Sequence, residues 1–401
     1  MNDLVIENIG KIVTPRSTPW RMKDEVETIE NAQIEISHGL IIDIKPNNSR
    51  SEAKIRVDAG GMLVTSALYD AHTHMLFYGE RSWELSLKLS GVSYDEILRR
   101  GGGIYSTAQA TEKASDAELM EVLKLRLKQA ELNGTAGAEV KTGYSVNAEG
   151  EKRLLKVIKE TSSDVITRST LLMHVPPKNS DREDYIKKMI ENLNAGPDYA
   201  DVFCDKEAFT LEESEKFLSA AKDKGIGLRL HADEIEYIGC SDLVEKMPLK
   251  TVDHLLKTPS DIMKKIAHSS AAAVLLPCTA LSLMSNNKPK VNVLRQENGI
   301  VAIGTDFSPN SWCLNMQTAM ELSTYLYGLT PLEALLASTA NSAYSLGLND
   351  HGLIRKGAKA NLIIWKVEKP DWLTYWFGEN KISSLIINGK IVKKEQINVK
   401  F

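Results

Sequence analysis

The two ends of the chain share one pattern of apolar positions, and the middle follows another. Short β-rich runs occupy residues 4–6, 11–13, 32–36 and 40–44, and again 361–365, 385–387 and 390–392. His38-Gly39 and Asn388-Gly389 each separate two such runs, which is a hairpin signal because these residue types tolerate positive φ. Neither end is long enough to cover its own sheet face. We therefore expect residues 1–60 and 353–401 to form one small β-sandwich together.

The middle of the chain, residues 61–352, alternates strands with helices. Residues 116–133 repeat apolar side chains at Leu119, Leu123 and Leu127, and Thr210 and Thr330 each precede a glutamate by three positions, as in a capping box. The first strand is expected at residues 61–69. Candidate strands end near His74, Lys141, His174, Cys204, His231, His254, Pro277 and Asp306.

Eight such units predict an α/β fold, a (β/α)₈ TIM-like barrel. The alternative is a doubly wound open sheet. We favour the barrel because polar residues fall at the carboxyl ends of many different strands, and only a closed barrel brings all those ends to one mouth.

Composition describes a globular chain without a charged binding surface. The 401 residues carry 49 basic and 53 acidic side chains, a net charge of −4, which argues against nucleic-acid and anionic-membrane partners. The four cysteines are widely spaced, so we interpret each as a small buried residue and expect a reducing compartment. No signal peptide is evident, and the most apolar run, 271–284, is broken by Pro277. We expect a cytoplasmic protein.

Histidines and one aspartate at strand ends predict a metal site. His72 and His74 follow an apolar strand, and residues i and i+2 of a strand point to the same side, so both imidazoles can reach one ion. His231 and Asp306 each lie at the end of another strand. Three imidazoles and a carboxylate, with room for water, are typical of a catalytic mononuclear centre. Arg81, seven residues past His74, is placed to grip a substrate carboxylate at the barrel mouth.

This constellation resembles the amidohydrolase superfamily of metal-dependent barrel hydrolases, whose members also carry a small β-sandwich built from both termini. More locally, the chain is similar to the imidazolonepropionase family from about residue 60 to residue 350, in the same order throughout. The motifs that carry this similarity are residues 70–79, 101–104, 139–144, 201–204, 231–234, 253–254 and 304–307.

The resemblance implies a hydrolase that opens the ring of 4-imidazolone-5-propanoate to N-formimidoyl-L-glutamate in histidine degradation. A metal-activated water would attack the ring carbonyl, with Asp306 and His254 accepting its proton or steadying the oxyanion and Glu234 protonating the departing nitrogen. Relatives with two metals use a carbamylated lysine on the fourth strand, which this chain lacks there. We therefore expect one Zn²⁺ or Fe ion per subunit, and we interpret Lys141, on the second strand, as salt-bridged or snorkelling.

The resemblance also implies the substrate contacts. Besides Arg81, they include Tyr144, His174 and Glu234, and the loop residues Ser308, Asn310 and Ser311. This loop departs from the family, because Ser308-Pro309-Asn310-Ser311 stands where Asn-Pro-Gly is usual after the metal-binding Asp-Phe, so its polar side chains are rearranged. The expected partner is the small-molecule substrate, and we expect a homodimer.

Two alternatives remain at this point. The nearer is another mononuclear deaminase of the same superfamily, acting on a guanidine, purine or formimidoyl substrate and releasing ammonia. The other is a non-catalytic barrel that serves as a binding module, which degenerate metal ligands would favour. All four ligand positions are intact in this chain.

Overall fold

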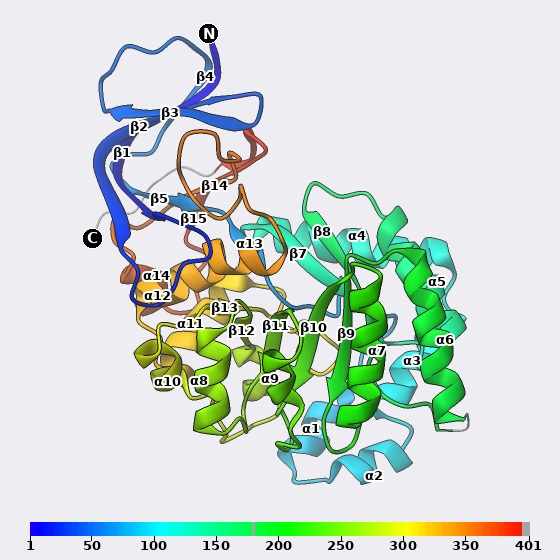
Figure 1. Cartoon of the computed structure of the whole chain (residues 1–401). Helices are drawn as coiled ribbons and strands as arrows, with labels where there is room; N and C mark the ends of the chain where they lie inside the picture. The colour runs from blue at the N-terminus through cyan, green and yellow to red at the C-terminus, as the bar shows by residue number, and fades with distance from the viewer. Residues whose placement is uncertain (179–180, 395–401) are drawn as a thin grey trace.

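The computed structural model describes residues 1–178 and 181–394, which form a parallel barrel and a separate sheet built from both chain ends (Figure 1). The eight barrel strands follow one another in chain order, each parallel to the next, and end close to the expected positions. They are β6 (Leu68–Asp70), β7 (Thr135–Lys141), β8 (Ile166–Met173), β9 (Tyr199–Cys204), β10 (Gly227–Ala232), β11 (Leu249–His254), β12 (Ala272–Leu275) and β13 (Val301–Ile303). The predicted barrel is confirmed.

The barrel closes through the segments that follow its first and last strands. The Asp306 amide donates to the His72 carbonyl at 3.0 Å, and the His74 amide donates to the Phe307 carbonyl at 2.9 Å. These bonds fix the two segments side by side beyond β6 and β13. Candidate ligands that lie more than two hundred residues apart in the sequence are therefore neighbours at the barrel mouth.

Helices surround the barrel, and their starts match the capping signals. Thr210 and Thr330 each form a capping box with the glutamate three residues on, and Leu119, Leu123 and Leu127 are buried on one helix. The α-helices are α1 (Trp83–Leu89), α2 (Tyr94–Arg99), α3 (Gly103–Lys113), α4 (Asp116–Leu132), α5 (Ala148–Glu160), α6 (Arg182–Asn192), α7 (Leu211–Asp223), α8 (Ser260–His268), α9 (Pro277–Ser282), α10 (Val291–Gln296), α11 (Met316–Tyr327), α12 (Pro331–Leu336), α13 (Ser342–Ser345) and α14 (Trp372–Tyr375). Shorter turns are the 3₁₀ segments η1 (Leu193–Ala195) and η2 (Cys240–Glu245) and the π-helical segment η3 (Ala337–Asn341).

The second sheet joins the two termini, as the apolar pattern predicted. Its strands are β1 (Asn2–Pro15), β2 (Val26–Ser37), β3 (Leu40–Pro46), β4 (Ala53–Asp58), β5 (Leu63–Ser66), β14 (Leu362–Trp365), β15 (Ile382–Ile387) and β16 (Lys390–Lys394). The order is β16-β15-β14-β5-β1-β2-β3, with β4 also paired to β1, so N- and C-terminal strands meet at β5. His38-Gly39 joins β2 to β3 and Asn388-Gly389 joins β15 to β16, each pair with positive φ at both residues.

The prediction of a single strand at residues 61–69 is wrong. The structure divides this segment into β5, in the terminal sheet, and β6, in the barrel. The Ala67 amide donates to the Asn361 carbonyl, whereas the next amide, that of Leu68, donates to the Gly134 carbonyl. One apolar run thus supplies strands to two sheets, because both of its halves are buried on all sides and periodicity cannot mark the change of partner.

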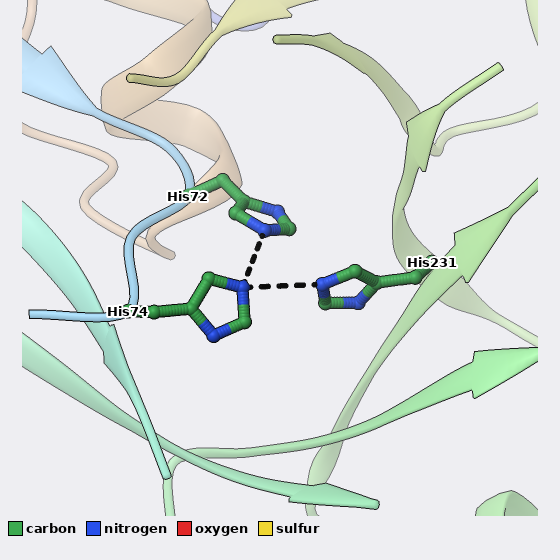
Figure 2. Close-up of side chains that lie close together, drawn as sticks. All are labelled: His72, His74 and His231. Carbon is green, nitrogen blue, oxygen red and sulfur yellow. Dashed lines mark hydrogen bonds between the residues drawn. The ribbon is translucent and has the colours of Figure 1, made fainter. Parts of the chain in front are cut away.

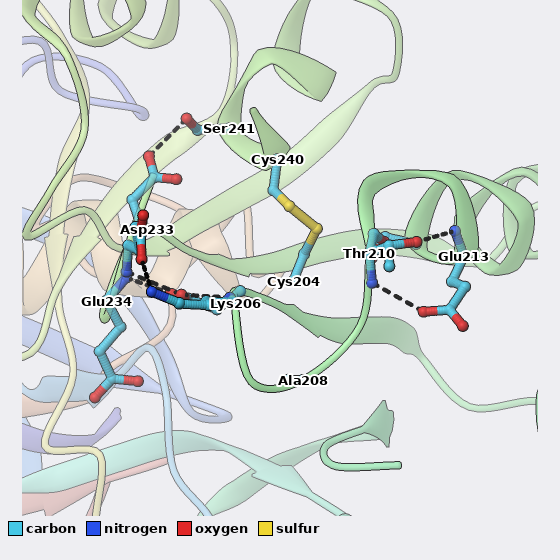
Figure 3. The surroundings of a disulfide bond; sticks show 12 residues. Cys204, Lys206, Ala208, Thr210, Glu213, Asp233, Glu234, Cys240 and Ser241 are labelled. Atoms are coloured by element: carbon cyan, nitrogen blue, oxygen red, sulfur yellow. Dashed lines mark hydrogen bonds and ion pairs between the residues drawn. A yellow bond between two sulfur atoms is a disulfide. The ribbon is translucent and has the colours of Figure 1, made fainter. Parts of the chain in front are cut away.

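The interpretation of the four cysteines as small buried residues in a reducing compartment is wrong in two respects, because Cys313 is only half-buried and two others are paired. Cys204, at the end of β9, and Cys240, at the start of η2, form a disulfide (Figure 3). The barrel makes β9 and β10 neighbours, and the chain that leaves β10 returns to the end of β9. Sequence spacing did not show this approach, and the argument from unpaired cysteines to a reducing compartment no longer holds. Cys278 and Cys313 are free thiols.

Membrane insertion through a helix finds no support in the part of the chain that the structure describes. None of its helices combines the length and the apolar character that crossing a bilayer requires.

Candidate metal and active site

Four side chains from three parts of the barrel converge at its mouth. His72 and His74 leave the segment after β6, His231 lies on β10, and Asp306 follows β13. The Nε2 atom of His74 lies 3.3 Å from that of His72 and 3.5 Å from that of His231 (Figure 2). The Asp306 Oδ1 atom lies 3.4 Å from His72 Nε2 and 3.3 Å from His74 Nε2. The structure brings together the four residues that sequence reasoning selected as ligands.

Two buried carboxylates set the orientation of two of these imidazoles. The His72 Nδ1 atom lies 2.6 Å from Asp253 Oδ2, and the His231 Nδ1 atom lies 2.9 Å from Asp201 Oδ2. A carboxylate accepts hydrogen bonds, so each Nδ1 is placed to carry a hydrogen, which in a neutral ring leaves the Nε2 lone pair free. Burial alone would lower the pKa of His231, but the facing Asp201 reverses this and raises it. Such carboxylate–histidine pairs are typical of metal-binding histidines.

This donor set fits one metal ion. The Nε2 atoms of His72 and His231 both face His74 Nε2, beside an Asp306 carboxylate oxygen. One cation placed among these buried atoms would be a partner for all of them. Burial, with help from His231 and Lys141 among other neighbours, holds the pKa of His72 well below its usual value and keeps it in the neutral form that binds metals. Burial also lowers the pKa of His74. Three imidazoles and one carboxylate suit both zinc and iron.

A network of fully buried charges lies beneath the ligands. Lys141 Nζ is 2.5 Å from Asp201 Oδ2 and 2.8 Å from Glu139 Oε2, and Arg229 Nε is 3.1 Å from Glu139 Oε1. The interpretation of Lys141 as a salt-bridged lysine is confirmed, but the snorkelling alternative is wrong because its side chain has no exposed surface. Burial alone would lower the pKa of Lys141, and the facing Asp201 and Glu139 reverse this and raise it.

Sequence reasoning assigned no role to Asp201, Asp253 or Glu139. A signal for them did exist, since each is an acidic residue inside a barrel strand that is mostly buried, and such a charge is costly to bury unless it is paired. Their partners come from other strands, however, and only the closed barrel shows which charges meet.

Glu234 lies on a loop that is held from both sides. The Asp205 carboxylate accepts hydrogen bonds from the Glu234 amide and from the next two amides, each at 2.9 Å. The preceding residue, Asp233, has φ of 59° and accepts from Ser241 Oγ at 2.6 Å (Figure 3). Burial, and then the nearby Asp306, raises the pKa of Glu234 to about 8, so this carboxyl group carries a proton at neutral pH.

His254 completes this side of the site. Its Nδ1 atom lies 3.6 Å from Glu234 Oε1, and its ring centre lies 5.3 Å from that of His231. The residue has φ of 73°, an unfavourable conformation for a non-glycine residue that concentrates at functional sites. Burial, and then His231, lowers the pKa of His254 well below its usual value, so the free imidazole is neutral and able to accept a proton.

Arg81 is buried with part of its guanidinium unsatisfied. One terminal nitrogen donates to Asn310 Oδ1, which also accepts from Lys88 Nζ at 3.2 Å. Arg81 Nε lies 3.6 Å from Glu84 Oε1, and Nη1 has no hydrogen-bond partner among the described residues. A buried guanidinium with a free donor suits an anionic ligand group.

Tyr144 and His174 line the same side as His74. The His174 ring stacks on that of His74 with centres 5.2 Å apart, and the buried Tyr144 ring meets it edge-on at 5.4 Å. Gly143 O lies 3.1 Å from His174 Nδ1. Burial, with smaller contributions from charges including Arg81, lowers the pKa of His174 to about 3.

The loop that departs from the family pattern folds back on itself. Ser308 and Ser311 are buried and exchange backbone hydrogen bonds of 3.0 and 3.1 Å, while the Asn310 side chain turns to Arg81. Thr279, on α9, donates to Asp306 Oδ2 at 2.5 Å and so fixes the ligand that precedes this loop.

A model of the amidohydrolase family matches residues 63–392. That span contains the barrel and all four convergent ligands, so the chain belongs to this family of hydrolases.

Curated relatives narrow this class. The chain is 48% identical to the imidazolonepropionase of Pyrobaculum arsenaticum over 96% of its own length and 99% of that protein. It is 34% identical to the imidazolonepropionase of Staphylococcus saprophyticus, over the whole of both chains. The chain is therefore a member of the imidazolonepropionases.

Solved structures share the fold at low identity. A triazine hydrolase variant superposes with a TM-score of 0.74 at 16% identity, covering 98% of this chain and 94% of the other. A zinc-bound adenosine deaminase from Xanthomonas campestris gives a TM-score of 0.69 at 17% identity, covering 100% and 95%. Similarity at this level extends to the fold alone.

Proposed function

We propose that this chain hydrolyses the ring C–N bond of 4-imidazolone-5-propanoate to give N-formimidoyl-L-glutamate, a step of histidine degradation. The observation that carries the choice among hydrolases of this class is Arg81, a buried guanidinium with a free donor. Glu84 and Asn310 leave the Arg81 Nη1 donor without a partner, and the propanoate group would supply an acceptor for it. Substrates without a carboxylate would leave this donor unmet, which is costly in a buried site.

The metal proposal is one Zn²⁺ or Fe ion per chain. Its ligands would be His72, His74, His231 and Asp306, whose donor atoms already face one another. Lys141 supports a single ion, because its ammonium group occupies the space between Glu139 and Asp201 where a second cation would otherwise be needed. The chemistry that such an ion supplies is Lewis acidity, which lowers the pKa of water and polarises a carbonyl group.

The substrate would lie between two walls of the mouth. Arg81 would bind the propanoate, Tyr144 and His174 would hold the ring, and Ser308, Asn310 and Ser311 would border it on the loop after β13. The Asn310 side-chain oxygen accepts hydrogen bonds from both Arg81 and Lys88. A substrate carboxylate would replace this oxygen as the acceptor or share the two donors with it. The departure from Asn-Pro-Gly therefore places an uncharged acceptor beside the two cations.

The protons are moved by three side chains. Water adds to the ring carbonyl carbon, and Asp306 or His254 accepts the proton that it releases or steadies the oxyanion. The bond between this carbon and the ring nitrogen then breaks, and Glu234, whose raised pKa keeps it protonated, delivers a proton to the departing nitrogen. The nitrogen stays tethered in the product, so the substrate gains one water and releases nothing.

The decisive experiment follows mass and ammonia together. Purified protein given freshly prepared imidazolone propanoate should yield a product heavier by one water, with ammonia at background, and His231→Ala should yield none. Stoichiometric ammonia and turnover of a purine or formimidoyl substrate would overturn the proposal in favour of a deaminase.

We also propose a cytoplasmic homodimer that acts on this small metabolite. Trp83, Leu85 and Leu89 of α1 are exposed apolar side chains, which supports an interface between copies. Sedimentation of the purified protein tests the dimer. For the domain limits we propose boundaries near residues 60 and 352, with β5 extending the terminal unit to Ser66.

A further inference from the structure

Lys141 is a buried cation held by several anions. It ends β7 with no exposed side-chain surface, and its Nζ atom lies 2.5 Å from Asp201 Oδ2, 2.8 Å from Glu139 Oε2 and 3.8 Å from Asp253 Oδ2. Burying an ion carries a large desolvation penalty, and a buried ion pair therefore often adds little or nothing to the stability of the fold. Stability alone therefore does not explain why three carboxylates surround Lys141.

Two of these carboxylates also orient metal-ligand candidates, and they do so with the oxygen that faces the lysine. Asp253 Oδ2 lies 2.6 Å from His72 Nδ1, and Asp201 Oδ2 lies 2.9 Å from His231 Nδ1. Each of these oxygens thus has the ammonium group on one side and an imidazole N–H on the other. A shift of the lysine displaces the oxygen and, through it, the imidazole.

The lysine also opposes repulsion among the anions. Glu139, Asp201 and Asp253 lie on β7, β9 and β11 and all face the same dry space inside the barrel. Without the ammonium group these carboxylates would move apart, because like charges repel strongly in a medium of low dielectric constant. Arg229 neutralises Glu139 from the far side, with its other hydrogen bonds going to the Ala71 and Ser345 carbonyls.

We propose that Lys141 is a positioning residue for the metal centre. It holds Asp201 and Asp253 where they turn the Nε2 atoms of His231 and His72 toward the ion. The inference rests on the metal site of the proposed function, but not on the substrate.

The first test measures Zn²⁺ affinity by competition with a chromophoric chelator. Lys141→Met keeps the length of the side chain without its charge and should weaken Zn²⁺ binding roughly 10–100-fold, as loss of outer-shell partners does. Lys381→Met removes another fully buried lysine, which pairs with Glu321 and contacts neither Asp201 nor Asp253 in a hydrogen bond or ion pair of the described residues. This matched control should keep affinity close to that of the wild type at a comparable loss of thermal stability.

Equal affinity in Lys141→Met and the wild type, or equal weakening in both variants, would overturn the proposal. The first result would leave the lysine a purely structural role. The second would assign the effect to total buried charge instead of the Lys141 contacts.

A second test applies even if Lys141→Met fails to fold. Asp201→Asn removes the negative charge but keeps an acceptor oxygen, and Lys141→Met/Asp201→Asn removes the cation as well, which preserves the charge balance. The lysine lies closer to Asp201 than to Asp253, so most of its effect should already be lost in Asp201→Asn, and the double variant should bind Zn²⁺ less than tenfold more weakly than Asp201→Asn alone. A further tenfold weakening in the double variant would contradict the proposal. These measurements use Zn²⁺ alone, so they stay informative whatever ring substrate the enzyme accepts.

Discussion

At the scale of single residues, the proposed function assigns substrate binding and proton transfer to different side chains. Arg81 and Glu234 lie on different loops and contact different neighbours, Asn310 and Glu84 in one case and His254 in the other. Substitutions at the two positions should therefore give different kinetic patterns.

Arg81→Ala should mainly raise KM, because a carboxylate contact persists in the ground and transition states alike. Loss of a hydrogen bond between charged groups costs about 1.5–3 kcal/mol, so we expect a rise of roughly 10–100-fold. Steady-state kinetics check this against Arg99→Ala, which removes an exposed arginine of α2. An unchanged KM in Arg81→Ala would remove this residue from the substrate site.

Glu234→Gln should instead lower kcat by roughly 10²–10⁴-fold, the usual contribution of a positioned acid or base, with metal content kept. The matched control is Glu236→Gln, which lies on the same loop but pairs with Lys206 at the surface and should turn over normally. A pattern in Glu234→Gln that reproduces Arg81→Ala, with KM raised and kcat intact, would refute the proton-transfer role.

At the scale of elements, the disulfide stabilises the loop that carries Glu234. Cys204 precedes Asp205, whose carboxylate holds three amides of that loop, and Cys240 begins the turn that follows it. The bond thus ties the end of β9 to the chain that leaves β10, on either side of the proposed acid.

The double variant Cys204→Ala/Cys240→Ala should lower the free energy of unfolding by roughly 2–4 kcal/mol, as expected when a closed loop is released. Denaturant unfolding measures the change, and Cys278→Ala, which removes a free thiol, is the comparison. Equal unfolding midpoints for the wild type and the double variant would show that the bond adds no stability.

At the scale of the whole molecule, the metal ion should stabilise the barrel. Its candidate ligands come from the first, fifth and last strands or the segments that follow them, so the ion links distant parts of the closed sheet. A ligand that binds only the folded state raises the free energy of unfolding by about 2.7 kcal/mol when its free concentration is a hundred times its Kd.

Chelation should therefore lower the Tm of the wild type and leave His231→Ala nearly unchanged, since that variant should already have lost most of its ion with its fold retained. Elemental analysis and thermal unfolding check both statements. Wild-type metal content in His231→Ala would remove His231 from the site, and a Tm insensitive to chelation would show that the ion does not stabilise the fold.

The sequence by itself determined the fold class and the ligand types. The informative features are local: strand-end histidines at i and i+2, the strand-end Asp306, and the turn signals at both termini. Local patterns can be recognised in the sequence without the tertiary structure. These features were enough to predict the barrel, the sheet shared by the termini and the convergence of four candidate metal ligands.

Tertiary structure alone decided which distant groups meet. The division of residues 61–69 between two sheets, the Cys204–Cys240 bond and the pairing of Lys141 with Asp201 all depend on neighbours from other strands. Closure of the barrel creates these contacts. The sequence around a buried charge or thiol does not show which distant residue will pair with it. The outer support of the metal site was therefore hidden until the strands were placed side by side.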